Sequence, residues 1–120
     1  MIQAKDLRIG NWVKLDKYFY KVYSVNPLEN KLIDKDKIII SGWYVDGIKP
    51  IQLTEEILLK CGFKKINKIY FRKGALTIEV QSFGHFRVSF DGKMLVNLKH
   101  LHQLQNLYFA LSNEELNIEL

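Results

Sequence analysis

Cysteine and long apolar runs are scarce in this sequence. Their scarcity argues against disulfide-bonded proteins, cysteine-rich metal proteins and proteins that cross a membrane with a helix. Its 120 residues include a single cysteine, Cys61, which excludes an internal disulfide and a multi-cysteine metal site. No apolar run approaches the ~20 residues that a helix needs to cross a bilayer, and the first residues lack the apolar core of a signal peptide. We therefore expect a cytoplasmic protein with no membrane partner.

Acidic residues are missing from one stretch of the chain. Lys and Arg together number 18 and Asp and Glu 13, which gives a net charge of +5, and no acid lies between Glu56 and Glu79. That gap contains six cations: Lys60, Lys64, Lys65, Lys68, Arg72 and Lys73. A positive net charge favours anionic partners in general, and this distribution predicts one basic side of the molecule.

Sequence motifs for catalysis are absent as well. The chain has no Walker loop, GxGxxG, HExxH or GxSxG. Cys61 stands at the end of an expected helix, where a buried structural thiol is the better interpretation than a nucleophile. His100 and His102 diverge if both lie on a helix, so they cannot share a metal. We predict a protein that is not an enzyme and has no cofactor or metal; a catalytic site assembled only in three dimensions is the third alternative.

The first half of the chain is rich in aromatic and β-branched residues, and it predicts short strands. Residues 7–15 and 18–25 form a first pair, and residues 31–34 and 38–40 form two more strands. Their spacing and tight turns predict a small SH3-like barrel or a curled antiparallel sheet.

A short helix follows, and its ends are well marked. Thr54 is a natural N-cap, acids follow in the first turn, and Leu53 and Leu58 occupy the two positions of a hydrophobic staple. Gly62 can take the left-handed conformation that ends helices, so the helix runs from residue 55 to residue 60 or 61.

An antiparallel meander comes next. Its strands are expected at residues 69–71, 76–81, 85–90 and 94–98, with a type I′ turn at Asp91-Gly92. Apolar and polar residues alternate, which predicts one face covered by the final helix and one wet face.

The sharpest pattern is the closing helix over residues 100–111. At about 100° per residue, its apolar residues fall on one stripe, as a helix packed on a core requires. The stripe consists of Leu101, Leu104, Leu107, Tyr108 and Leu111. Phe109 lies beside the stripe and either widens the buried face or marks a subunit contact. The chain therefore predicts one α+β domain over residues 1–120, with a barrel-like half at 1–50 and a helix–meander–helix half at 51–120.

The wet face of the meander is the best candidate for a binding site. Arginine binds phosphate bidentately, tyrosine or histidine can stack on a base, and glutamine can select its edge. The predicted ligand-binding residues of this region are Tyr70, Arg72, Lys73, Gln81, His85 and Arg87. The alternative is a solvated sheet face whose lysines serve solubility and protect the sheet edge.

Aromatic residues form a second candidate site. Trp43 and Tyr44 follow a Ser-Gly break in a loop-like stretch, where an exposed aromatic can serve a partner or a ligand. Trp12 lies within an apolar strand, and we expect it in the core.

Three sequence blocks carry a resemblance to a protein family. They are LRIGNWV at residues 7–13, KPIQLTEEILLKCGF at 49–63 and HQLQNLYFALSNEEL at 102–116. With them, the chain resembles small uncharacterised proteins encoded in phages, prophages and other mobile elements of Bacteroidota. Asn113 stands where these proteins usually have glycine. The resemblance implies the cytoplasm of a host cell and offers no catalytic residues, and the basic stretch has no counterpart in it.

These observations together predict a non-enzymatic phage or mobile-element protein that binds an anionic ligand. Some small phage proteins of this size sequester nucleotide immune signals without cleaving them, and this is the sharpest version of the hypothesis. A pocket of that kind often needs a homo-oligomer. Two alternatives stay open: a protein-interaction module that inhibits or adapts a host or phage protein, and a nucleic-acid-binding accessory protein.

Overall fold

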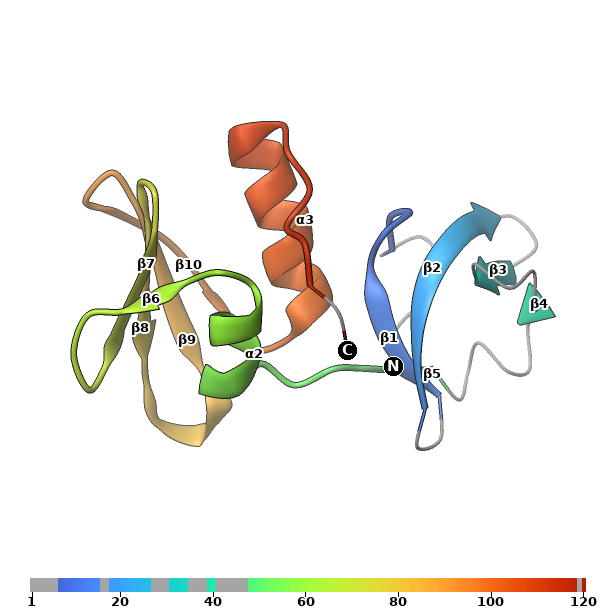
Figure 1. The fold of residues 1–120 in the computed structure, drawn as a ribbon, viewed down its shortest axis with the longest axis horizontal. Helices are drawn as coiled ribbons and strands as arrows, with labels where there is room; N and C mark the ends of the chain where they lie inside the picture. The colour runs from blue at the N-terminus through green and yellow to red at the C-terminus, as the bar shows by residue number, and fades with distance from the viewer. Residues whose placement is uncertain (1–6, 16–17, 27–30, 35–38, 41–47, 119) are drawn as a thin grey trace.

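Two antiparallel sheets stand on either side of one long helix (Figure 1). The computed structural model describes residues 7–15, 18–26, 31–34, 39–40, 48–118 and 120. Its elements are β1 (Trp12–Leu15), β2 (Tyr18–Asn26), β3 (Lys31–Asp34), β4 (Ile39–Ile40), β5 (Ile48–Pro50), α2 (Glu55–Lys60), β6 (Lys64–Lys65), β7 (Tyr70–Lys73), β8 (Leu76–Val80), the 3-10 turn η2 (Ser82–Gly84), β9 (Phe86–Phe90), β10 (Lys93–Leu98) and α3 (Leu101–Ser112). The predicted α+β class is confirmed. No helix in the described ranges is long and apolar enough to cross a membrane.

The first sheet has the strand order β4-β3-β2-β1-β5. Strand β1 is shorter than the sequence predicts, because the chain turns at Ile9 and Gly10, where Gly10 has φ +96°. Strand β5 was not predicted; it is three residues long and pairs with β1 through Val13 and Pro50. Neither sheet closes on itself among the described strands, so the predicted antiparallel sheet is confirmed and the SH3-like barrel is not.

The second sheet contains the four strands of the predicted meander and one that was not predicted, β6, in the order β10-β9-β8-β7-β6. The hairpin between β9 and β10 turns at Asp91 (φ 53°) and Gly92 (φ 83°), as a type I′ turn requires. Alternation along the strands is confirmed by burial: Phe71, Ile78 and Val88 have no exposed surface and point into the core. The opposite side of this sheet, called the outer face below, carries the polar residues.

Helix α2 begins and ends where its sequence predicts. The Thr54 hydroxyl accepts a hydrogen bond from the backbone N–H of Ile57 at 3.1 Å. At the other end Gly62 has φ +91°, and the N–H of Phe63 donates to the carbonyl of Leu58 at 3.1 Å, which completes a Schellman turn. Both staple residues are buried.

Helix α3 begins one residue later than predicted. His100 is its N-cap, and the Gln103 side chain accepts a hydrogen bond from the His100 backbone N–H at 3.1 Å. Because His100 precedes the helix, its ring does not diverge from that of His102; the two rings stack with centroids 5.9 Å apart. Asn113 takes the left-handed conformation (φ 58°) that ends the helix.

One hydrophobic cluster joins α2, α3, the second sheet and the C-terminal residues, and Trp12 of the first sheet enters it as expected. Leu101 and Leu104 of the predicted stripe are fully buried, whereas the rest of the stripe is partly buried. Cys61 is a buried thiol, and burial raises its pKa to about 12. A thiol in that state is structural, as the sequence indicates.

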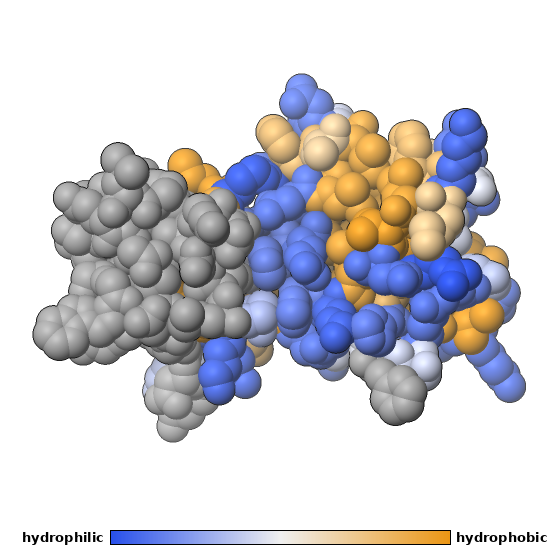
Figure 2. All heavy atoms as spheres, turned by 180° about the vertical axis from the view of Figure 1, so that it is seen from behind, coloured by the Kyte–Doolittle hydropathy of each residue, from blue (hydrophilic) through white to orange (hydrophobic). Residues whose placement is uncertain are grey.

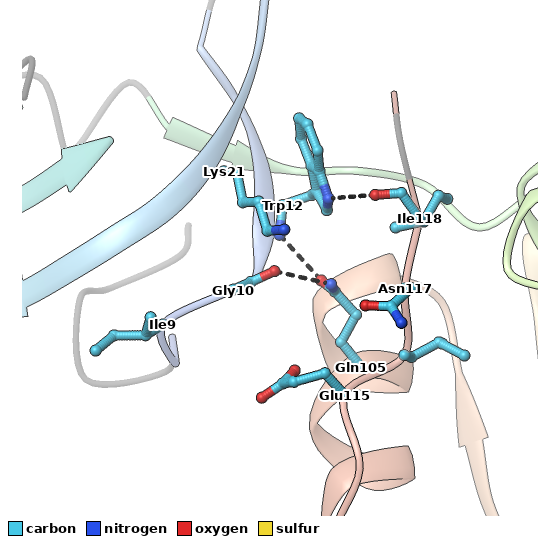
Figure 3. Close-up of a pocket in the computed structure, with 9 residues that line it drawn as sticks. Ile9, Gly10, Trp12, Lys21, Gln105, Glu115, Asn117 and Ile118 are labelled. Carbon is cyan, nitrogen blue, oxygen red and sulfur yellow. Dashed lines mark hydrogen bonds between the residues drawn. The ribbon is translucent and has the colours of Figure 1, made fainter. Parts of the chain in front are cut away.

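A buried polar network joins the first sheet to α3 (Figure 3). Gln105 is 1% exposed; its side-chain oxygen accepts from the Trp12 backbone N–H at 2.9 Å, and its amide donates to the Gly10 carbonyl at 3.0 Å. The Trp12 indole N–H donates to the Ile118 carbonyl at 3.1 Å. The two bonds of Gln105 satisfy backbone groups of Gly10 and Trp12 that face the helix, where no neighbouring strand can bond them.

Arg8 reinforces the same contact from the surface. Its guanidinium donates to Glu115 at 2.6 Å and to the Asn106 side chain at 3.0 Å, and lies 4.3 Å above the centre of the Phe109 ring. Phe109 is thus half-buried beneath Arg8 of the same chain. This contact explains why an aromatic residue lies beside the apolar stripe.

Replacing a stripe leucine tests the packing of α3. We expect Leu104→Ala to lower the free energy of unfolding by about 2–5 kcal/mol, because the side chain is fully buried and would leave a cavity. The matched control is Leu59→Ala on α2, where the leucine is 52% exposed and the loss should be small. Urea unfolding measures both; equal losses would contradict the packing described here.

Replacing Gln105 tests the polar network. Gln105→Leu keeps a similar volume but leaves the Trp12 N–H and the Gly10 carbonyl without their partner. We expect the free energy of unfolding to fall by about 1–3 kcal/mol for each buried group left unsatisfied. Unfolding in urea provides the measurement, and a variant as stable as the wild type would show that water replaces the glutamine at no cost.

Candidate functional site

The outer face of the second sheet carries most of the predicted site residues. Tyr70, Glu79 and Arg87 lie directly opposite one another on β7, β8 and β9. Arg72 is two residues along β7 from Tyr70, and Gln81 lies two residues after Glu79, just beyond the end of β8. The strand registers therefore bring Tyr70, Gln81 and Arg87 together.

A carboxylate stands at the centre of this group. Glu79 accepts a hydrogen bond from the Tyr70 hydroxyl at 2.9 Å and another from the Gln81 side chain at 2.9 Å, and a guanidinium nitrogen of Arg87 lies 3.6 Å from it. The hydrogen bonds from Gln81 and Tyr70 lower the pKa of Glu79, and the same bond to Glu79 raises the pKa of Tyr70. The place expected for a phosphate is thus occupied by a negative side chain.

The alternation of apolar and polar residues along β8 puts Glu79 on this face but does not reveal a role for it. Alternation alone shows that Glu79 and Arg87 point the same way; only the register shows that they are opposite each other. Arg72, the second predicted phosphate ligand, is opposite Thr77 and lies two strands, or about 10 Å, from the strand of Arg87. The two arginines therefore do not form one clamp.

The other predicted residues are placed separately. His85 is half-buried where η2 joins β9. Lys73 is opposite Leu76, so it lies toward the core side of the sheet; its ammonium donates to the Cys61 carbonyl at 3.0 Å, at the C-terminal end of α2, and lies 5.8 Å from the Tyr108 ring centre. Lys73 thus stabilises a helix end. Trp43 lies outside the described residues.

A second group of cations lies at the corner formed by β6 and β7. Lys64 is directly opposite Arg72 in the antiparallel pair, and both side chains are exposed. The Nε of Arg72 donates to the Gly74 carbonyl at 3.1 Å, which fixes the direction of its guanidinium. A hollow of about 300 Å³ opens here, and we call it the basic hollow. Its lining residues are Gly62, Lys64, Ile66, Arg72, Lys73 and Gly74.

Neighbouring lysines of the basic stretch are paired with acids, in contrast to the basic hollow. Lys60 lies 3.9 Å from Glu56, and Lys65 lies 3.5 Å from Glu55. In the described part of the chain, no carboxylate lies within 4 Å of the side-chain nitrogens of Lys64 or Arg72. Lys64 and Arg72 therefore face each other without a compensating carboxylate; Lys68 of the same stretch has no described ion pair either, but it lies outside the hollow.

Another cleft, of about 260 Å³, lies between the first sheet and the C-terminal residues (Figure 3). Its walls include Ile9, Trp12 and Gln105, and the charged side chains at its rim are Lys21 and Glu115. Glu115 is already held by Arg8, and Gln105 by the polar network, so these two polar side chains of the cleft serve the contact between sheet and helix. Among the described residues no group of three potential metal ligands comes together.

Comparison with protein-family models, with curated proteins and with solved structures finds no match to this chain. What the protein binds must therefore be inferred from the charge and shape of its own surface.

Removing one hydroxyl tests the Glu79 cluster. We expect Tyr70→Phe to raise the pKa of Glu79, because the carboxylate loses a hydrogen bond that favours its charged form. An NMR titration of the Glu79 carboxyl measures this, with Thr77→Ala on the same face as control.

The same cluster has a consequence for stability. A carboxyl whose pKa is lowered in the folded protein stabilises the fold above its unfolded pKa, and this stabilisation is lost as the pH falls through the folded pKa. The difference in melting temperature between wild type and Tyr70→Phe should therefore shrink in acid. A difference that stays constant with pH would contradict the role assigned to Glu79.

Proposed function

We propose that the protein binds a phosphate-bearing ligand in the basic hollow and does not transform it. The observation that carries this proposal is the direct opposition of Lys64 and Arg72 without a carboxylate beside either. Like charges directly opposite on paired strands destabilise a sheet, and an anion between them removes that cost.

Geometry favours a phosphate among anions. Arg72 is oriented by its bond to Gly74, so its two terminal nitrogens are free to bind two oxygens of one phosphate. Lys64 supplies a second positive charge from the facing strand. The volume of about 300 Å³ is at the small end of ligand pockets, enough for the phosphate end of a nucleotide and part of its sugar.

The lining residues support binding without catalysis. They comprise cations, glycines and one isoleucine, and none is a carboxylate or an imidazole that could move a proton near neutral pH. Sequestration of a nucleotide signal, in the phage setting that the sequence resemblance implies, is the sharper form of this proposal. It replaces the outer-face site of the sequence hypothesis with a site that keeps Arg72 and Lys73 and adds Lys64.

Two adjacent lysines provide a matched test. We expect Lys64→Gln and Arg72→Gln to weaken the binding of a nucleoside triphosphate by about tenfold or more, because a charge-assisted hydrogen bond is worth roughly 1.5–3 kcal/mol. Lys65→Gln removes the same charge from the next residue, but Lys65 is paired with Glu55. The affinity of this variant for the nucleotide should therefore stay near that of the wild type. Isothermal titration calorimetry measures all three.

Salt dependence separates a pocket from a nucleic-acid surface. Equal losses in the Lys64 and Lys65 variants, together with an affinity for short oligonucleotides that falls steeply with salt, would favour the nucleic-acid alternative. If neither nucleotides nor oligonucleotides bind at micromolar concentration, the proposal is wrong and the protein-interaction alternative takes its place.

A further inference from the structure

Ile66 is the apolar residue among those that line the basic hollow, and its side chain is 58% exposed. Exposure alone does not single it out, because apolar side chains also reach the surface over much of the half of the molecule that holds the second sheet and α3 (Figure 2). Its position does, since it shares one hollow with the cations Lys64 and Arg72. A ligand that covers Ile66 therefore also reaches a positive site.

The strand register sets the order of residues along the hollow. Lys64 lies opposite Arg72 in an antiparallel pair, so Ile66 lies beyond this pair on one side and Gly74 lies beyond it on the other. Two residues along a strand are about 6.6 Å apart, which is the distance from the cation pair to Ile66. The Arg72 guanidinium is turned toward the Gly74 end by its bond to the Gly74 carbonyl at 3.1 Å. A side chain at Gly74 would meet no atom within 4 Å, so this end has room for a phosphate.

The turn that carries Ile66 is held by hydrogen bonds. The backbone N–H of Ile66 donates to the Tyr70 carbonyl at 2.9 Å. The side-chain oxygen of Asn67 accepts from the backbone N–H groups of Ile69 and Tyr70, each at 3.0 Å. Because isoleucine is also stiff at χ1, a ligand meets an apolar surface that is already in place. Little conformational freedom is then lost on binding.

We infer that Ile66 is the contact for the base of a nucleotide whose phosphate lies between Lys64 and Arg72, an inference that rests on the function proposed above. A nucleotide has the same order of parts as the hollow: a charged phosphate, then a sugar, then a flat ring with apolar faces. One isoleucine can cover one such ring. The acyl chain of a lipid phosphate would need several apolar residues, and the lining offers one.

The same lining predicts that the base is selected by its area and not by its identity. None of the lining side chains carries a hydrogen-bond acceptor. Their donors are the two cations that hold the phosphate and Lys73, whose ammonium already donates to the Cys61 carbonyl. Purines, which have the larger ring, should therefore bind more tightly than pyrimidines, and adenine and guanine should bind about equally.

Calorimetry with nucleoside triphosphates and with inorganic triphosphate tests the role of Ile66. In Ile66→Ser, the ratio of the ATP affinity to the triphosphate affinity should fall about three- to tenfold, because the base loses part of its apolar contact. The triphosphate affinity itself should not change. Ile69→Ser is the matched control, since Ile69 is 44% exposed in the same turn but does not line the hollow. Ile66→Leu keeps the apolar area and should keep the ratio.

Failure of this inference can be distinguished from failure of the proposed function. If triphosphate binding requires Arg72 but the ratio is the same in Ile66→Ser as in the wild type, the base contact is wrong and the phosphate site stands. Equal falls in Ile66→Ser and Ile69→Ser also overturn the contact, as does an ATP affinity more than tenfold different from the GTP affinity. If neither ATP nor triphosphate binds, the proposed function and the base contact are both wrong.

Discussion

The Gln105 side chain is the contact on which the arrangement of the two halves depends. Gln105 is buried, and it bonds both the Trp12 N–H and the Gly10 carbonyl. These two backbone groups therefore stay hydrogen-bonded where the chain faces α3 instead of another strand. With β1 fixed in this way, Trp12 can enter the core that α3 shares with the second sheet. Residues 7–13 and 102–116 meet at this contact, which gives both segments a structural role in this chain.

Charge pairing then decides which cations are available to a ligand. Arg8 and Arg87 each neutralise a glutamate, and Lys73 binds the carbonyl at the end of α2. These residues are as basic as Lys64 and Arg72, but their charge is used within the fold. A count of positive residues along the sequence therefore overstates the basic surface, and the proposed site is where pairing is missing.

Much of the fold is predictable because its signals are local. Thr54, Gly62 and Asn113 set helix ends through their own backbone preferences, and the Asp91-Gly92 turn does the same for a hairpin. The alternation of apolar residues likewise identifies the inner face of the second sheet. Each of these depends on residues only a few positions apart, so a single sequence is enough.

The features that escaped prediction depend on pairings between distant residues. Strand β5 exists only because β1 lies beside it, and Gln105 looks like an ordinary helix polar residue until the partners some 95 positions away are known. The arrangement of the candidate site residues could not be predicted for the same reason: opposition of Glu79 to Arg87, and of Lys64 to Arg72, is a matter of register.

The contact between Trp12 and residues 105–118 also affects how the chain folds during its synthesis. Ribosomes make chains from the N-terminus at about 5–20 residues per second, so β1 emerges several seconds before the helix that satisfies it. Until then the Trp12 indole N–H and the Gly10 carbonyl lack the partners that Ile118 and Gln105 supply in the folded protein. A segment made later thus completes one made earlier, and a chaperone acting on the nascent chain would find β1 as an early exposed target.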